Sequence, residues 1–291
     1  MNGPVASPAA PTGPTVRQVV RRAQAYLDRH GVEGSAASAE LLLAHVLGTD
    51  RAALALAPRT LSPAESKAFG RALCRRCQGT PVQHLTGEAG FRHLVLQVRP
   101  GVFIPRPETE VLVDVVLAAL LGVADPKVVD VGTGTGAIAL SIKDERPDAR
   151  VVATDRSPEA VRLARANAAR LGLDVEVVES DLLTSLPIDE QNPFDAVISN
   201  PPYVAASDHG SLPADVKADP YEALVGDRSV YANLAHQASD RLVPGGVLGV
   251  EIEETSGEDV CQQLRDAGFV EVTLARDLAG RDRVVTARMP T

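Results

Sequence analysis

The chain has 291 residues, of which 45% are hydrophobic and 23% charged, a composition typical of a folded globular protein rather than a disordered or fibrous one. Its net charge of -9 at pH 7 argues against binding nucleic acid over a broad surface, because such surfaces need clustered Lys and Arg. No apolar run approaches the ~18 residues that span a bilayer, and three cysteines without a secretion signal favour a reducing, cytoplasmic location.

The first part of the chain predicts a disordered tail followed by a small helical bundle. Residues 1–14 are rich in Ala and Pro and predict the tail. Helical periodicity then predicts helices that begin at Thr15 and near Ala36. The run from Ser62 to Glu65 combines a capping box with a proline at the first helical position, so a third helix begins there. Because residues 15–80 contain no obvious catalytic cluster, we expect this domain to bind a substrate.

The rest of the chain predicts an α/β domain. Residues 81–106 predict a β-hairpin linker, and residues 107–291 alternate strand and helix patterns from Lys127 onward, as in a parallel sheet covered on both faces. A segment too short for a crossover helix joins the last two strands, so these should pair antiparallel. Seven strands are expected, near residues 127–131, 150–154, 174–178, 194–199, 246–252, 269–275 and 283–288.

A glycine-rich turn follows the first strand of this sheet. Its residues are Gly132, Thr133, Gly134, Thr135 and Gly136. Glycines let the backbone approach a ligand closely, and Asp155, at the end of the next strand, can accept hydrogen bonds from ribose hydroxyls. The pattern therefore predicts a cofactor that contains a nucleoside, and it fits both NAD and S-adenosylmethionine.

Two further strand ends favour S-adenosylmethionine over NAD. Asp181 and Leu182 follow the third strand, where an acid and an apolar side chain can hold an adenine, and Asn200 follows the fourth. S-adenosylmethionine methyltransferases use four such strand ends in succession, whereas the second nucleotide of NAD would need other contacts. We therefore expect a methyl donor at this edge of the sheet.

The fourth strand ends in the loop Asn200-Pro201-Pro202-Tyr203. Its two prolines offer carbonyl acceptors without N–H donors and fix φ. The Asn200 side-chain oxygen and the Pro201 carbonyl can accept both protons of a planar NH2 group and aim its lone pair at a methyl donor, while Tyr203 stacks on the group. A turn without function is the alternative for an isolated Asn-Pro. After a glycine turn, the loop predicts methylation of an amide or an exocyclic amine.

In these motifs the chain resembles the protein-(glutamine-N5) methyltransferases of peptide chain release factors. The resemblance covers about residues 15–290, and its specific pieces are residues 81–87, 103–110, 130–137, 199–203 and 281–285. Adenine-N6 and cytosine-N4 methyltransferases share the Asn-Pro-Pro-Tyr loop. The helical bundle and the linker motif from Phe103 to Glu110 therefore distinguish this family.

The resemblance implies a seven-stranded, Rossmann-like class I methyltransferase sheet with an antiparallel last hairpin, preceded by the helical domain. It also implies that the substrate is the glutamine of the Gly-Gly-Gln loop in release factors 1 and 2. S-adenosylmethionine would be bound by residues 132–136, Asp155, Asp181, Leu182 and Asn200. The glutamine amide would be bound by residues 200–203, with Asn200, Pro201 and Tyr203 acting in catalysis and Phe103, Arg106 and Thr109 walling the pocket.

An adenine-N6 methyltransferase acting on a flipped base of DNA or RNA is the alternative function. It should carry a basic region that recognises its target, yet residues 1–125 have only a small excess of Lys and Arg over Asp and Glu. A non-catalytic assembly factor with this fold is a third hypothesis, against which the intact Asn200 and glycine turn argue.

Two other groups of residues are expected to have no role in chemistry. Cys74 and Cys77 have a spacing seen in metal sites, but they lie in a predicted helix with no second pair nearby, so no metal is expected. The acidic residues Glu251, Glu253 and Glu254 begin at the end of a predicted strand and are expected to face solvent, and a carboxylate close to the cofactor cation is the alternative.

Overall fold

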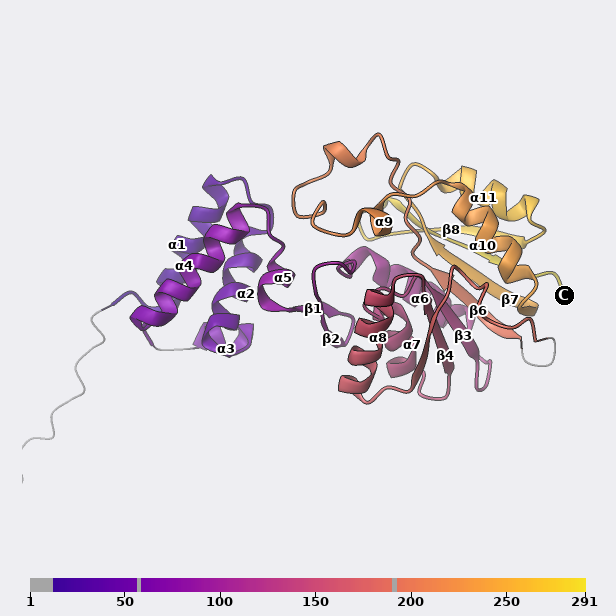
Figure 1. The fold of residues 1–291 in the computed structure, drawn as a ribbon, viewed down its shortest axis with the longest axis horizontal. Coiled ribbons are helices and arrows are strands. Elements are labelled where there is room, and N and C mark those ends of the chain that lie inside the picture. Colours follow the sequence, from indigo (N-terminus) through magenta and orange to yellow (C-terminus); the bar gives the residue numbers. More distant parts are fainter. Residues whose placement is uncertain (1–12, 57–58, 190–192) are drawn as a thin grey trace, which may run out of the picture. The chain divides into compact units, whose positions relative to one another are not determined.

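The computed structural model describes residues 13–56, 59–189 and 193–291 (Figure 1). The chain forms two compact units, Met1–Thr86 and Gly87–Thr291. Most of the tail predicted for residues 1–14 lies outside the described residues. Among the described helices, none has the length and apolar character needed to cross a membrane.

The N-terminal unit is built from helices. These are α1 (Val16–Arg29), α2 (Ser35–Leu47), α3 (Arg51–Leu56), α4 (Pro63–Cys77) and α5 (Val82–Thr86). The predicted capping box is present at the start of α4, where Ser62 Oγ accepts from Glu65 N at 3.2 Å and Glu65 accepts from Ser62 N at 2.8 Å. Helices α3 and α5 were not predicted, because helices of six and five residues are too short to show a periodic pattern.

The C-terminal unit begins with the antiparallel hairpin of β1 (Glu88–Phe91) and β2 (Leu94–Gln97). The short 3-10 helix η1 (Pro107–Thr109) then leads into α6 (Glu110–Ala119). The predicted linker, residues 81–106, is therefore divided: α5 belongs to the N-terminal unit and the hairpin to the C-terminal one.

A seven-stranded sheet forms the centre of this unit. Its strands are β3 (Lys127–Val131), β4 (Arg150–Asp155), β5 (Val175–Glu179), β6 (Phe194–Ser199), β7 (Leu242–Glu251), β8 (Val270–Arg276) and β9 (Asp282–Arg288). They lie in the order β5-β4-β3-β6-β7-β9-β8, with β9 antiparallel to both β7 and β8 and the other neighbours parallel. The predicted sheet with an antiparallel last hairpin is confirmed. Strand β7 begins four residues earlier than expected.

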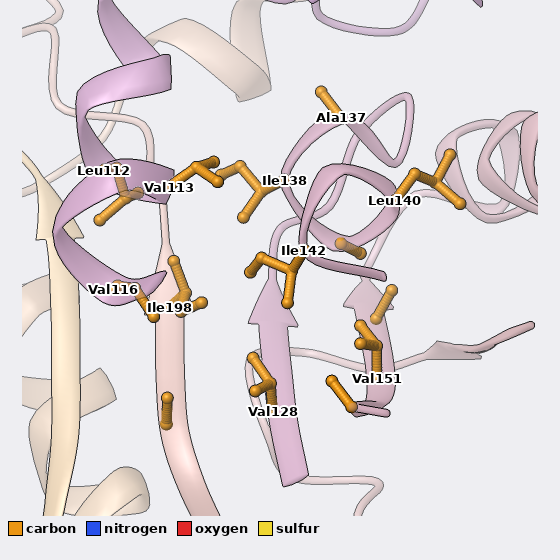
Figure 2. Close-up of a cluster of buried hydrophobic side chains, with 14 of the residues drawn as sticks. Leu112, Val113, Val116, Val128, Ala137, Ile138, Leu140, Ile142, Val151 and Ile198 are labelled. Atoms are coloured by element: carbon orange, nitrogen blue, oxygen red, sulfur yellow. The ribbon is translucent and has the colours of Figure 1, made fainter. Parts of the chain in front are cut away.

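Helices cover both faces of the sheet (Figure 1). On one face, α6, α7 (Ala137–Glu145) and α8 (Pro158–Leu171) pack against the strands, and on the other lie α10 (Ser229–Ser239) and α11 (Gly257–Asp266). Figure 2 shows Val116 of α6 next to Ile198 of β6, and Ile142 of α7 next to Val128 of β3. Each large apolar side chain buried in this way contributes about 1.5–3 kcal/mol to stability. The parallel strands are therefore held rigidly, and their ends can position a site.

A long connection joins β6 to α10. It contains the 3-10 helix η2 (His209–Ser211) and the short helix α9 (Tyr221–Leu224). An isolated β-bridge pairs Val204 with Val225, so the connection returns to the loop that follows β6.

Candidate active site

The glycine turn between β3 and α7 has a conformation that only glycine adopts readily. Gly132, Gly134 and Gly136 have φ values of +76°, +56° and +87°. The backbone N–H of Gly132 donates to the Thr154 carbonyl at the end of β4, at 2.8 Å. On the other side, the buried Asn167 side chain of α8 donates to the Thr135 carbonyl at 2.9 Å. The turn is therefore fixed from two sides, and it exposes bare backbone at its glycines while the side chains of Thr133 and Thr135 are buried.

Asp155 lies at the end of β4, against this turn. Its carboxylate accepts hydrogen bonds from the backbone N–H of Gly134 at 2.9 Å and of Ser157 at 2.8 Å. Burial raises the pKa of Asp155 above its ordinary value, and these two donors oppose that rise. Each carboxylate oxygen has a second lone pair. Asp155 is therefore held in place and still able to accept hydrogen bonds from ribose hydroxyls.

Asp130 was not singled out as a site residue from the sequence, although it is a charged residue within an otherwise apolar strand. It is fully buried, and its Oδ2 accepts from Thr133 Oγ1 at 2.6 Å and from Ala139 N at 3.1 Å. Burial raises the pKa of Asp130 to about 7. Because the two donors lie in the glycine turn and in α7, Asp130 supports the turn from beneath.

The predicted residues after β5 lie beside those after β4. The Leu182 carbonyl accepts from Thr154 Oγ1 at 3.0 Å, and Ser180 N donates to the Asp155 carbonyl at 3.0 Å. Leu182 has a positive φ of 50° and a half-buried side chain, whereas Asp181 is exposed. The ends of β5, β4, β3 and β6 thus form a continuous row along one edge of the sheet.

Asn200 lies directly after β6, at the end of this row. Its Nδ2 donates to Thr109 Oγ1 at 3.2 Å. The Oδ1 atom of the same amide therefore points away from Thr109. Pro201 is buried and Pro202 half-buried. The contact brings together two predicted site residues that are 91 positions apart in the chain.

Tyr203 is anchored through its hydroxyl, which donates to Glu251 Oε1 at 3.3 Å. Burial raises the pKa of Tyr203 well above its ordinary value, so the phenol stays protonated. The expectation that Glu251 faces solvent was wrong, because the Glu251 side chain is buried at the end of β7 beneath the loop. Glu254, three residues on, is exposed as expected.

Arg106 lies beside Phe103, which is close to it in the chain, and beside Asp219, which is far from it. Its guanidinium forms an ion pair with the buried Asp219 and lies 5.3 Å from the centre of the Phe103 ring. Asp219 also accepts from Ile104 N at 3.0 Å, and burial raises its pKa to about 6 against the effect of Arg106. Asp219 was not predicted, because a single acid in a loop gives no signal. It fastens the segment that carries Phe103 and Arg106 to the connection after β6.

Among the residues that the structure describes, no three His, Cys, Asp or Glu side chains are grouped so that they could hold a metal ion. A cavity of roughly 540 Å³ lies at the opposite, amino-terminal edge of the sheet, lined by Lys127, Arg150, Phe194 and Arg241 among others. Its cations alternate with acids such as Asp174, and none of the predicted site residues lines it. We therefore place the site at the carboxyl edge.

Comparison with known proteins defines the class of this protein. Residues 95–215 match the family model described as the methyltransferase small domain. The fold resembles a methyltransferase from Pyrococcus furiosus (TM-score 0.52, 16% identity, 77% of this chain and 100% of the other). It also resembles a 16S rRNA N2 G1207 methyltransferase of T. thermophilus, solved with AdoMet and guanosine (TM-score 0.51, 21% identity, 69% and 49%). The chain is a methyltransferase.

More similar relatives define the family. Release factor glutamine methyltransferase from Deinococcus radiodurans is 41% identical over 94% of this chain and 98% of its own. The enzyme of that name from Escherichia coli K12 is 39% identical over 86% and 91%. Residues 18–87 match the PrmC N-terminal domain model. The chain belongs to the release factor glutamine methyltransferase family, and the nucleic-acid alternative is not favoured.

Proposed function

We propose that this protein transfers the methyl group of S-adenosylmethionine to the side-chain amide nitrogen, N5, of the glutamine in the Gly-Gly-Gln motif of release factors 1 and 2. The observation that carries the proposal is the position of the Asn200 amide at the end of the glycine-turn row, with Nδ2 engaged by Thr109. Its oxygen is then available to accept a proton of a substrate amide. The names of the relatives support a glutamine as that substrate.

The strand ends fit the parts of S-adenosylmethionine, which supplies an electrophilic methyl group when bound. Gly132, Gly134 and Gly136 would offer bare backbone to the amino acid portion, since the side chains of Thr133 and Thr135 between them are buried, and Asp155 would offer acceptors to the ribose hydroxyls. Asp181 and the half-buried Leu182 lie where the adenine would follow. S-adenosylhomocysteine would remain as the product.

The loop after β6 would bind the substrate amide. An amide nitrogen is a poor nucleophile because its lone pair is delocalised. The site must therefore orient this lone pair toward the methyl group as well as bring the two groups together. Asn200 Oδ1 and the Pro201 carbonyl would accept its two protons, and the rings of Tyr203 and Phe103 would hold the planar group. The surplus proton can leave after the transfer, so no strong base is needed in this loop.

We assign recognition of the release factor to the helical domain, residues 15–80, and methyl transfer to residues 107–291. The match of residues 18–87 to the PrmC N-terminal domain supports this division. We propose a cytoplasmic location for the activity, which suits a chain with three cysteines.

The test is transfer of labelled methyl groups to purified release factors 1 and 2 and, in separate reactions, to DNA and RNA. Label in the nucleic acid and none in either factor would refute the proposal. Asn200→Ala should lower kcat by at least about 100-fold, because the amide loses its orientation. The Kd for S-adenosylmethionine should change little. Asn233→Ala, at an exposed position on α10, is the matched control and should be fully active.

A further inference from the structure

The hairpin of β1 and β2 is a two-stranded sheet of its own, separate from the central sheet. Such a hairpin has little stability by itself, and its outer edges carry backbone groups that strand pairing leaves without partners. Val98 N donates to the Gly87 carbonyl at 3.0 Å. Because backbone groups alternate between the two edges of a strand, the N–H and carbonyl of Gln97 face away from β1. The outer edge of β2 therefore needs another element to satisfy it.

Helix α8 satisfies this edge with side chains. Asn167 Oδ1 accepts from Gln97 N at 2.8 Å, and Asn167 Nδ2 donates to the Gln97 carbonyl at 3.0 Å. Three residues on, Arg170 donates to the Val95 carbonyl. Residues three apart lie on the same face of a helix. One face of α8 thus binds the edge of β2 much as a neighbouring strand would.

The same Asn167 amide also holds the glycine turn. Its Nδ2 donates to the Thr135 carbonyl at 2.9 Å. The Ala139 N–H, four residues after Thr135, donates to Asp130 instead, so this carbonyl is left for a side-chain donor. Asn167 is 0% exposed, so water does not compete freely for its bonds. An inverted amide would set its oxygen against two carbonyls, which fixes the orientation of the group.

We infer that Asn167 is a positioning residue that couples the β1–β2 hairpin to the glycine turn, so that the affinity for S-adenosylmethionine depends on how the hairpin is docked. The inference rests on the proposed function, since it takes the glycine turn as the cofactor site. Asn167 would act through the Thr135 backbone. Because the hairpin directly follows the N-terminal unit in the chain, the coupling joins the segment that leads from that unit to the cofactor site.

Apolar side chains should keep the hairpin attached when the bonds of Asn167 are removed. Phe91 and Leu96 of the hairpin are buried in the same core cluster as Ala164 and Ala168 of α8. Loss of the Asn167 amide should therefore displace the edge of β2 and the turn without unfolding the unit. Cofactor binding can then be measured on folded variants.

The test is the Kd for S-adenosylmethionine, measured by titration calorimetry. Asn167→Leu leaves the Thr135 and Gln97 groups unpaired and should raise the Kd by about 10- to 100-fold. Gln97→Pro removes one N–H at an edge that tolerates proline and should raise the Kd by about 3- to 10-fold. Val95→Pro is the matched control. It removes an N–H on the same edge that Asn167 does not bind, and it should leave the Kd unchanged.

A double variant and hydrogen exchange separate coupling from a local structural role. If the hairpin acts through Asn167, Gln97→Pro should hardly raise the Kd further in the Asn167→Leu protein. Coupling is reciprocal, so saturating S-adenosylmethionine should slow hydrogen exchange in β2 of the wild type. The same cofactor should leave exchange in β2 of Asn167→Leu unchanged. A side chain that only stabilised the fold would not make β2 respond to the cofactor.

A wild-type Kd in a folded Asn167→Leu protein would overturn the inference, and so would equal Kd values for Gln97→Pro and Val95→Pro. The second comparison decides even if Asn167→Leu does not fold. If the wild type binds S-adenosylmethionine but does not methylate a release factor, the proposed function fails while the Kd values still test the coupling. If the wild type does not bind S-adenosylmethionine, both fail.

Discussion

Single carboxylates do much of the positioning at this site, and each is held by donors from a different element. Asp155 accepts from the glycine turn and from the start of α8, and Asp130 accepts from the turn and from α7. Burial raises the pKa of both groups, which opposes ionisation, whereas the donors stabilise the charge. Both carboxylates fix the backbone around them, and we propose that Asp155 also offers lone pairs to the cofactor.

Asp155→Ala should raise the Kd for S-adenosylmethionine by roughly 10- to 100-fold, because hydrogen bonds to a charged group are worth about 1.5–3 kcal/mol. The Gly134 N–H also loses its acceptor, so the turn should loosen. Titration calorimetry measures the Kd directly. Asp144→Ala, at an exposed position on α7, serves as control. Wild-type affinity in the Asp155 variant would show that this carboxylate does not bind the cofactor.

At the scale of elements, the connection between β6 and α10 packs against the Asn-Pro-Pro-Tyr loop. Val204 N donates to the Leu224 carbonyl at 2.9 Å, and Gly226 N donates to the Val204 carbonyl at 3.1 Å. A Cβ atom at Gly226 would lie 2.0 Å from the Pro202 carbonyl oxygen, far inside contact distance. The backbone at residue 226 therefore packs directly against the loop, and only glycine leaves the Pro-Pro segment where it is.

Gly226→Ala should displace the Asn-Pro-Pro-Tyr loop and lower kcat/KM by about 100-fold, the loss expected for a misplacement near 1 Å. Gly210→Ala lies in the same connection, where an added Cβ would meet nothing within 4 Å, and should keep full activity. Steady-state methyl transfer compares the two. Circular dichroism checks that both remain folded. Equal activity of the two variants would mean that the loop does not depend on this contact.

At the scale of the whole molecule, burial of acids gives the C-terminal unit an unusual dependence on pH. Burial raises the pKa of Asp130 and Glu251 to about 7 and that of Asp219 to about 6. The unfolded chain releases the same protons near about pH 4. Between these values the folded state binds more protons, so the free energy of unfolding falls as pH rises. Exposed acids with a lowered pKa, such as Asp148 at about 2, change the free energy of unfolding only at lower pH.

The unfolding temperature of the C-terminal unit should therefore be higher at pH 5.5 than at pH 7.5, by at least about 2–4 °C, the shift that ~1 kcal/mol produces in a chain of this size. Glu251→Gln should reduce this slope, because it removes one of the groups that titrate on unfolding. Glu254→Gln should not, since that side chain is exposed. Calorimetric scans across the range provide the measurement. A slope of the opposite sign would contradict the burial argument.

The sequence by itself determined the sheet, the glycine turn and the Asn-Pro-Pro-Tyr loop. Each has a local pattern: apolar runs predict strands, positive-φ turns need glycine, and the carboxyl ends of parallel strands meet at one edge. The row from Asp181 through Asp155 and the glycine turn to Asn200 therefore follows from strand order alone.

Only the tertiary structure decided how these groups are held. The Asn200–Thr109 contact spans 91 residues and the Arg106–Asp219 pair 113, and neither partner carries a local signal of the other. Glu251 belongs to an acidic cluster whose pattern predicts a solvent-facing surface, yet its side chain is buried and accepts from the Tyr203 hydroxyl, while the Tyr231 hydroxyl donates to its backbone carbonyl. Patterns along a chain report periodicity and turns, whereas the partners of a buried polar group depend on which distant segments the core brings together.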